Sequence, residues 1–81
     1  MTHRSVLLFA RYAELFGAES VSVELPDGAT VADLIAALRA LPGGASLPPQ
    51  PFVAVAQAQA APGDRLPADA ELALLPPLAG G

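Results

Sequence analysis

One amphipathic segment, residues 31–41, constrains the fold of this chain more than any other part of the sequence. Its large apolar residues recur at intervals of three and four: Val31, Leu34, Ile35, Leu38 and Leu41. This spacing predicts a helix with a single apolar stripe. Thr30 and Asp33 form the pattern of a capping box at its start, and Pro42-Gly43-Gly44 predicts its end. The rest of the chain must therefore supply an apolar surface for this stripe to cover.

Four runs of apolar or alternating residues surround this helix and predict strands at residues 6–10, 21–25, 52–56 and 71–75. Residues 11–16 carry apolar side chains at helical spacing before Gly17, which predicts one or two turns of helix. The three prolines within residues 48–51 predict an irregular connection. This order of elements indicates an α+β fold in which one long helix covers one face of a sheet.

The predicted sheet carries more apolar residues than one helix can cover. In the first strand, Leu7 and Phe9 lie on one side and the other apolar residues lie on the opposite side. In the last strand, Ala73 and Leu75 lie on the side opposite to the other two leucines. Large contiguous apolar patches are rare on soluble monomers, so we expect the uncovered face to bind a partner. The alternative is that loops fold over it.

Length, charge and missing residue types narrow the classes of function. A chain of 81 residues has room for one small domain. Eight acidic residues against four arginines give a net charge of −4, which argues against direct nucleic-acid binding. The five apolar residues before Arg11 are too few for a signal peptide or a membrane span, so we expect a cytoplasmic protein.

Cysteine is absent, which excludes disulfides, thiolate metal ligands and thiol nucleophiles. Lysine is absent as well. The absence of lysine either reflects a GC-rich genome that favours arginine or keeps amines away from a reactive acyl end.

The remaining side chains offer little chemistry. His3 lies close to an N-terminus that we expect to be frayed, and no other residue could act as a base for the serines. Asp64 and Asp69 flank a predicted loop, where aspartates usually form turns rather than metal sites. We therefore expect no catalytic side chain, no metal site and no stably bound cofactor.

The C-terminal residues are the remaining candidate for function. Gly80 and Gly81 lack Cβ atoms, so they can pass through a channel that is too narrow for other residues, with the Gly81 carboxylate leading. Pro76 and Pro77 favour an extended stem, and six residues span roughly 20 Å. We therefore expect a domain at residues 1–75 and a flexible tail at residues 76–81. A glycine pair at an ordinary, inactive terminus is the alternative.

Several stretches together resemble the small subunit of molybdopterin synthase. They are Leu8-Phe9-Ala10-Arg11 with Glu14-Leu15 and Gly17, Glu24-Leu25-Pro26, Gly28-Ala29-Thr30-Val31, Val53-Ala54-Val55 and the ending Leu75-Pro76-Pro77-Leu78-Ala79-Gly80-Gly81. The ending is the most specific of these. The chain departs from the family at Ala56, where an asparagine is usual, and at Ala68-Asp69-Ala70-Glu71, where Asp-Gly-Asp-Glu is usual.

This resemblance implies a ubiquitin-like β-grasp fold, with a mixed sheet covered on one face by the long helix, and a role as sulfur carrier. The Gly81 carboxyl group, preceded by Gly80, would be adenylated by an E1-like enzyme that uses ATP and then converted to a thiocarboxylate. Within a heterotetramer, the large subunit of molybdopterin synthase would use this sulfur to convert cyclic pyranopterin monophosphate to molybdopterin. The chain would thus be the sulfur-donating subunit of a sulfurtransferase. Phe9, Leu75, Pro76, Pro77 and Leu78 would contact the large subunit.

Other functions remain open at this stage. A carrier that ends in Gly-Gly could serve thiazole synthesis or tRNA thiolation instead, although thiazole carriers tend to lack the double proline. The chain could also be a ubiquitin-like modifier that is joined to lysines of target proteins. A third alternative is a β-grasp interaction module whose tail has no role.

Overall fold

The computed structural model describes residues 2–48 and 51–76. Eight elements follow one another along the chain: β1 (Thr2–Leu8), α1 (Arg11–Phe16), β2 (Ser20–Leu25), α2 (Val31–Arg39), the 3-10 helix η1 (Gly44–Ser46), β3 (Phe52–Val55), β4 (Ala58–Gln59) and β5 (Leu72–Leu75). The predicted order of strands and helices is confirmed. The short elements η1 and β4 were not predicted.

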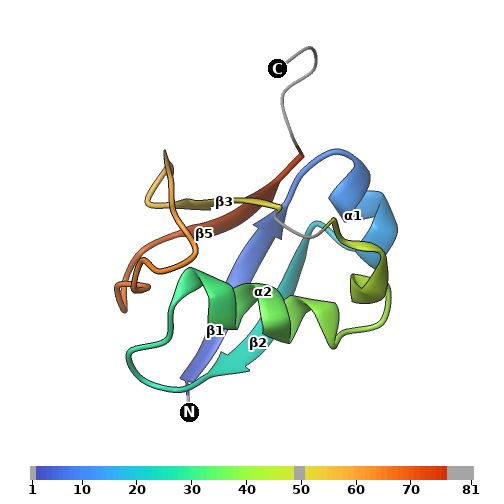
Figure 1. The fold of residues 1–81 in the computed structure, drawn as a ribbon. Coiled ribbons are helices and arrows are strands. Elements are labelled where there is room, and N and C mark those ends of the chain that lie inside the picture. Colours follow the sequence, from blue (N-terminus) through green and yellow to red (C-terminus); the bar gives the residue numbers. More distant parts are fainter. Residues whose placement is uncertain (1, 49–50, 77–81) are drawn as a thin grey trace.

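The five strands form one mixed sheet in the order β2-β1-β5-β3-β4. β1 and β5 pair in parallel, whereas the pairs β1–β2, β3–β5 and β3–β4 are antiparallel. α2 crosses one face of this sheet, as Figure 1 shows. The arrangement confirms the predicted ubiquitin-like β-grasp fold, with β5 at the centre of the sheet.

The core lies between α2 and the sheet face that it covers. Its most deeply buried side chains come from β1, α2, β3 and β5: Val6, Val31, Leu34, Leu38, Val53, Leu72 and Leu74. The strand residues of this set fall at every second position, because alternate side chains of a strand point to the same face. The apolar stripe predicted for residues 31–41 thus packs where expected, although α2 itself ends at Arg39.

Local side-chain hydrogen bonds fix both ends of α2. The Asp33 backbone N–H donates to Thr30 Oγ1 at 3.3 Å, and the Thr30 N–H donates to Asp33 Oδ2 at 2.9 Å, which confirms the capping box. Beyond the helix, the Arg39 guanidinium donates to the carbonyl oxygens of Leu47 and Pro48. These bonds fasten the segment that contains η1 to the end of α2.

The N-terminal strand differs from the prediction. It begins at Thr2 instead of residue 6, because residues 2–7 of β1 pair with β2 along its whole length. The expectation of a frayed end at His3 was wrong: His3 lies opposite Glu24, with 3.5 Å between His3 Nε2 and Glu24 Oε1. The strand also stops at Leu8 instead of residue 10, since Ala10 has a φ of 52° that a strand cannot accommodate.

Candidate functional site

The sheet face turned away from α2 carries an apolar surface across β1, β5 and β3. Five side chains point to this side, which we call the outer apolar face. Leu7, Phe52 and Leu75 are half-buried, whereas Ala54 and Ala73 are buried. Cross-strand pairing joins them as Leu7↔Ala73, Ala54↔Ala73 and Phe52↔Leu75. These pairs alternate with the core pairs Leu8↔Leu74 and Val53↔Leu74 and therefore point to the opposite side. The predicted apolar surplus on the uncovered face is confirmed.

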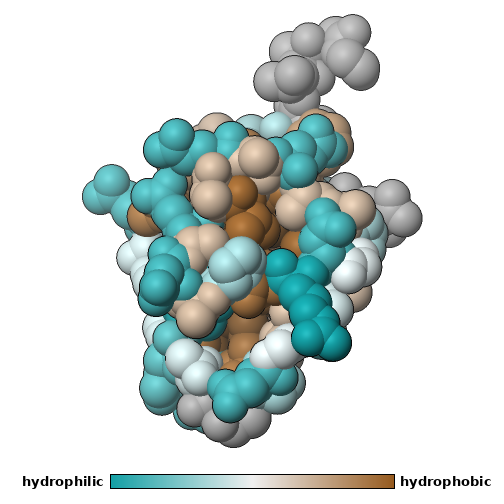
Figure 2. Space-filling view, turned by 90° about the vertical axis from the view of Figure 1, so that its left-hand side faces the viewer, coloured by the Kyte–Doolittle hydropathy of each residue, from teal (hydrophilic) through white to brown (hydrophobic). Residues whose placement is uncertain are grey.

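A groove of about 320 Å³ opens beside this face. It is lined by residues of β3, β4 and the end of β5, together with the β3–β4 turn: Phe52, Val53, Ala54, Gln57, Gln59, Leu75 and Pro76. Figure 2 shows a band of hydrophobic surface between polar rims on the side of the molecule where β3 and β5 lie. The chain leaves the sheet at Pro76, so this groove lies at the base of the C-terminal tail.

Phe9 lies at the same end of the sheet. β1 and β5 pair in parallel up to Leu8↔Leu74, so Phe9 follows β1 at the end of the sheet where Leu75 ends β5. The side chain of Phe9 is 45% exposed. Among the described residues, no other large hydrophobic side chain is classed as exposed. A tight turn follows, in which the Tyr12 N–H donates to the Phe9 carbonyl at 3.1 Å.

The structure places three of the predicted contact residues at one end of the sheet. Leu75 and Pro76 line the same groove, and Phe9 follows the last residue of β1, the strand that pairs with β5. Pro77, Leu78, Gly80 and Gly81 lie outside the described residues. A partner could bury its own apolar side chains against Phe9 and Leu75. Such burial would contribute favourably to the free energy of binding.

Comparison with known proteins decides the family. The family model described as ThiS matches residues 6–81, nearly the whole chain. The chain belongs to the ThiS family of ubiquitin-like sulfur carriers. The match includes Gly80 and Gly81, the residues that were predicted from the sequence to be the reactive end.

Several solved structures share the fold of this ThiS-family chain. SAMP1 from Haloferax volcanii is 31% identical, with a TM-score of 0.79 over 99% of this chain and 100% of that one. A protein described as subunit 1 of molybdopterin converting factor from Pyrococcus furiosus is 23% identical, with a TM-score of 0.81 over 96% of this chain and 100% of that one. A complex of subunits 1 and 2 of this factor from Helicobacter pylori matches at 18% identity and a TM-score of 0.68, over 99% of this chain and 100% of that one. Among curated proteins, none matches significantly.

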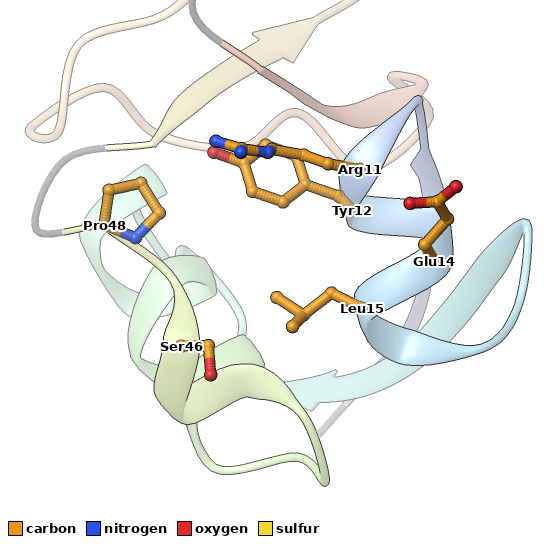
Figure 3. Close-up of a pocket in the computed structure, with 6 residues that line it drawn as sticks. All are labelled: Arg11, Tyr12, Glu14, Leu15, Ser46 and Pro48. Carbon is orange, nitrogen blue, oxygen red and sulfur yellow. The ribbon is translucent and has the colours of Figure 1, made fainter.

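A second cavity in this ThiS-family chain was not foreseen from the sequence. It measures about 470 Å³ and lies between α1 and the end of η1 with the segment that follows, lined by Arg11, Tyr12, Glu14, Leu15, Ser46 and Pro48. Figure 3 shows the α1 side chains on one side of the hollow and Ser46 and Pro48 on the other. The two linings are about 30 residues apart in sequence, and the hydrogen bonds of Arg39 to residues 47 and 48 fasten the second lining to α2. No sequence motif signals such a contact.

Within residues 2–48 and 51–76, no three His, Cys, Asp or Glu side chains lie close enough to hold a metal ion. In the same part of the chain, no helix has the length and hydropathy needed to cross a membrane.

Proposed function

We propose that this chain is the sulfur carrier of molybdenum cofactor biosynthesis, the small subunit of molybdopterin synthase. In this role its Gly81 thiocarboxylate donates sulfur to cyclic pyranopterin monophosphate. The observation that carries the proposal is the end of β5: half-buried Leu75 and Pro76 end the described chain beside an apolar groove, at the same end of the sheet as exposed Phe9. A large subunit can therefore hold the outer apolar face and receive the tail at the same time.

Activation of Gly81 follows from the weakness of a free carboxylate as an acyl donor. An E1-like enzyme would join the Gly81 carboxylate to the α-phosphate of ATP, with pyrophosphate as the leaving group. A sulfur nucleophile would then displace AMP and leave a thiocarboxylate. ATP is consumed on the activating enzyme, so the carrier itself needs no bound cofactor.

The large subunit would supply the groups that this chain lacks. General acid–base residues and a site for the phosphate of the pterin are required, and an acidic chain with a net charge of −4 is poorly suited to bind an anion. The same charge favours a partner whose docking surface is basic around an apolar centre. The similarity to the Helicobacter pylori complex of subunits 1 and 2 supports such a pairing.

Reconstitution tests the pathway assignment. Thiocarboxylated carrier is mixed with a molybdopterin synthase large subunit and cyclic pyranopterin monophosphate, and molybdopterin is measured as its fluorescent oxidation product. The proposal predicts molybdopterin in proportion to the thiocarboxylate supplied. A thiocarboxylated carrier that binds the large subunit without forming any product would contradict it and favour thiazole synthesis or tRNA thiolation.

A second function is favoured by one comparison. SAMP1, which is described as a small archaeal modifier protein, is 31% identical to this chain over nearly its full length. A modifier would form an isopeptide between Gly81 and lysines of target proteins. Peptide mapping of cells that express a tagged carrier tests this alternative. After trypsin, which cleaves behind Arg65, a modifier leaves residues 66–81 joined through Gly81 to target lysines, and a dedicated sulfur carrier does not.

A further inference from the structure

Within the described residues 2–48 and 51–76, one edge of the sheet is long and has no further strand beside it. The strand order β2-β1-β5-β3-β4 places β2 and β4 at the two edges, and Figure 1 shows β2 next to β1. β4 has only two residues, and such a short edge strand offers another chain little to pair with. β2 has six residues in a regular register, without the lysine, proline or bulge that proteins use to block an edge. The edge formed by β2, which we call the β2 edge, is therefore open to pairing.

The register of β1 and β2 shows which backbone groups point outward at the β2 edge. The Leu8 N–H donates to the Glu19 carbonyl at 2.8 Å, so these two residues form a hydrogen-bonded pair. Such pairs alternate with pairs that exchange no hydrogen bond. Continued along β2, the alternation leaves Ser20, Ser22 and Glu24 in pairs of the second kind. Each of these three residues therefore turns its N–H and its C=O away from β1, toward the open side.

The side chains of β2 divide between the two sides of the sheet. Ser20, Ser22 and Glu24 are exposed on the side away from α2. Val23 is buried on the α2 side, and Val21 is half-buried there and packs against the core. A strand that pairs with the β2 edge must therefore be polar on one side and apolar on the other.

A second copy of β2 meets this requirement. Two β2 strands can run antiparallel about a two-fold axis at Ser22, so that Ser22 faces its own counterpart and Ser20 faces Glu24 of the second copy. In this register each of the three outward residues donates one hydrogen bond and accepts one. Val21 faces Val23 of the second copy, which makes an apolar β-branched pair on the α2 side. No like charges lie directly opposite each other, because Glu24 faces a serine.

We propose that two copies of this chain form a symmetric dimer through the β2 edge, with one continuous sheet. Both α2 helices lie on the same side of this sheet, because the two-fold axis of an antiparallel pair is perpendicular to it. The groove at Pro76 is lined by residues of β3, β4 and β5, which lie on the other side of β1 from β2. Dimerisation therefore leaves this groove accessible, and the inference does not depend on the proposed function.

The net charge of the chain sets the conditions under which the dimer forms. Each copy carries a net charge of −4, and the repulsion between two such chains weakens association at low salt. Salt screens this repulsion, whereas it has little effect on hydrogen bonds between strands. We therefore expect a weak dimer that is favoured by high protein concentration and by added salt.

The absence of cysteine allows a direct test of the register. Ser22→Cys in the full chain places one thiol of each copy at the two-fold axis, where the two Cα atoms are about 5.5 Å apart and a disulfide can form. Ser20→Cys is the matched control, because it changes the same residue type on the same strand at an equally exposed position. Its two thiols lie four residues apart along the strands, roughly 14 Å, which is beyond the reach of a disulfide.

Under mild oxidation at about 0.5 mM protein, Ser22→Cys should form a disulfide-linked dimer at least about ten times faster than Ser20→Cys. Equal rates would mean that the thiols meet by random collision, and the proposal would be wrong.

A second experiment measures the mass of the wild-type protein by sedimentation between about 0.02 mM and about 1 mM. The mass should rise toward twice that of the monomer, and further at about 0.5 M salt than at about 0.15 M. Ser22→Lys should abolish this rise, because two like charges then meet at the axis. Ser5→Lys, the same change on the neighbouring strand β1, should leave the rise in place.

Two results of this experiment would overturn the proposal. A dimer that Ser22→Lys leaves intact would mean that the copies associate through another surface. A wild-type mass that stays at the monomer up to about 1 mM would leave the β2 edge to an extended segment of another protein.

Discussion

Leu75 of β5 lies directly opposite Phe52 of β3, on the face of the sheet that points away from α2. Their neighbours in the register, Leu74 and Val53, are both buried in the core on the other face. One side of β5 therefore packs in the core and stabilises the fold. The other side leaves the apolar side chain of Leu75 available at the base of the tail. Variants can separate these two roles.

A charge at Phe9 should weaken binding of the large subunit with little effect on folding. Phe9 is 45% exposed and is not part of the core, so Phe9→Asp should change the free energy of unfolding by less than about 0.5 kcal/mol. The loss of a central apolar anchor costs about 2 kcal/mol or more, which is about a 30-fold rise in Kd. Calorimetric titration and urea unfolding measure the two effects.

Two further variants make this test specific. Leu75→Asp should weaken binding in the same way, whereas Ser5→Asp, on the polar part of the same sheet face, should leave the Kd within about twofold of wild type. If Phe9→Asp unfolds the protein, the side chain belongs to the core and its assignment to a docking surface is wrong.

Removal of the capping box should destabilise α2. Thr30→Ala deletes the hydroxyl that accepts a hydrogen bond from the Asp33 N–H, and such a loss costs about 1 kcal/mol. Thr2→Ala is the control, because the Thr2 hydroxyl bonds only to the exposed Asp27 carboxylate at 3.2 Å. Urea unfolding should show the loss for Thr30→Ala and almost none for Thr2→Ala. Equal losses would mean that the box contributes nothing specific.

The β3–β4 turn should be open to stabilisation. Val55 pairs with Ala58, and the two residues between them, Ala56 and Gln57, both have positive φ, 53° and 70°. Two-residue hairpin turns with this backbone favour asparagine and glycine, because other residues are strained there. Gln57→Gly should therefore raise the free energy of unfolding by about 0.5–1 kcal/mol.

Gln59→Gly is the matched control for this turn. It replaces the same residue type two positions later, within β4, where glycine weakens a strand. Gln59→Gly should leave stability unchanged or lower it. If Gln57→Gly lowers the free energy of unfolding, the side chain of Gln57 stabilises the fold by more than its backbone strain destabilises it.

A bulkier residue at the end of the tail should block sulfur transfer without affecting the fold. Gly81→Val keeps the carboxyl group but adds a side chain that a channel shaped for glycine cannot accept. We expect no detectable thiocarboxylate on this variant and a thermal midpoint within about 1 °C of wild type, because a change outside a core has little effect on stability. A large fall in the midpoint would contradict an exposed tail.

The sequence predicted those parts of the fold that depend on local pattern. The stripe from Val31 to Leu38 and the capping pair Thr30 and Asp33 are contained in one short segment, so periodicity and side-chain chemistry were enough to find α2. The Gly17 end of α1 has φ 71° and was found in the same way, since glycine adopts that backbone conformation readily.

The parts that were missed depend on contacts between distant residues. Arg4 of β1 pairs with Val23 of β2, and its guanidinium donates to the Ala70 carbonyl at 2.9 Å. This half of β1 therefore lacks an apolar pattern. The positive φ values of Ala10, Ala56 and Gln57 occur at residue types that rarely adopt them. The groove at Pro76 exists only because β3 pairs with β5, which no short window of sequence reveals.

The central claim, that Gly81 carries sulfur, is tested most directly by the intact mass of the protein after incubation with an activating enzyme, ATP and a sulfide source. The account predicts a gain equal to the replacement of one oxygen by sulfur, with no gain in a variant that lacks Gly81. An unchanged mass, under conditions in which the same activating enzyme modifies another carrier, would contradict it.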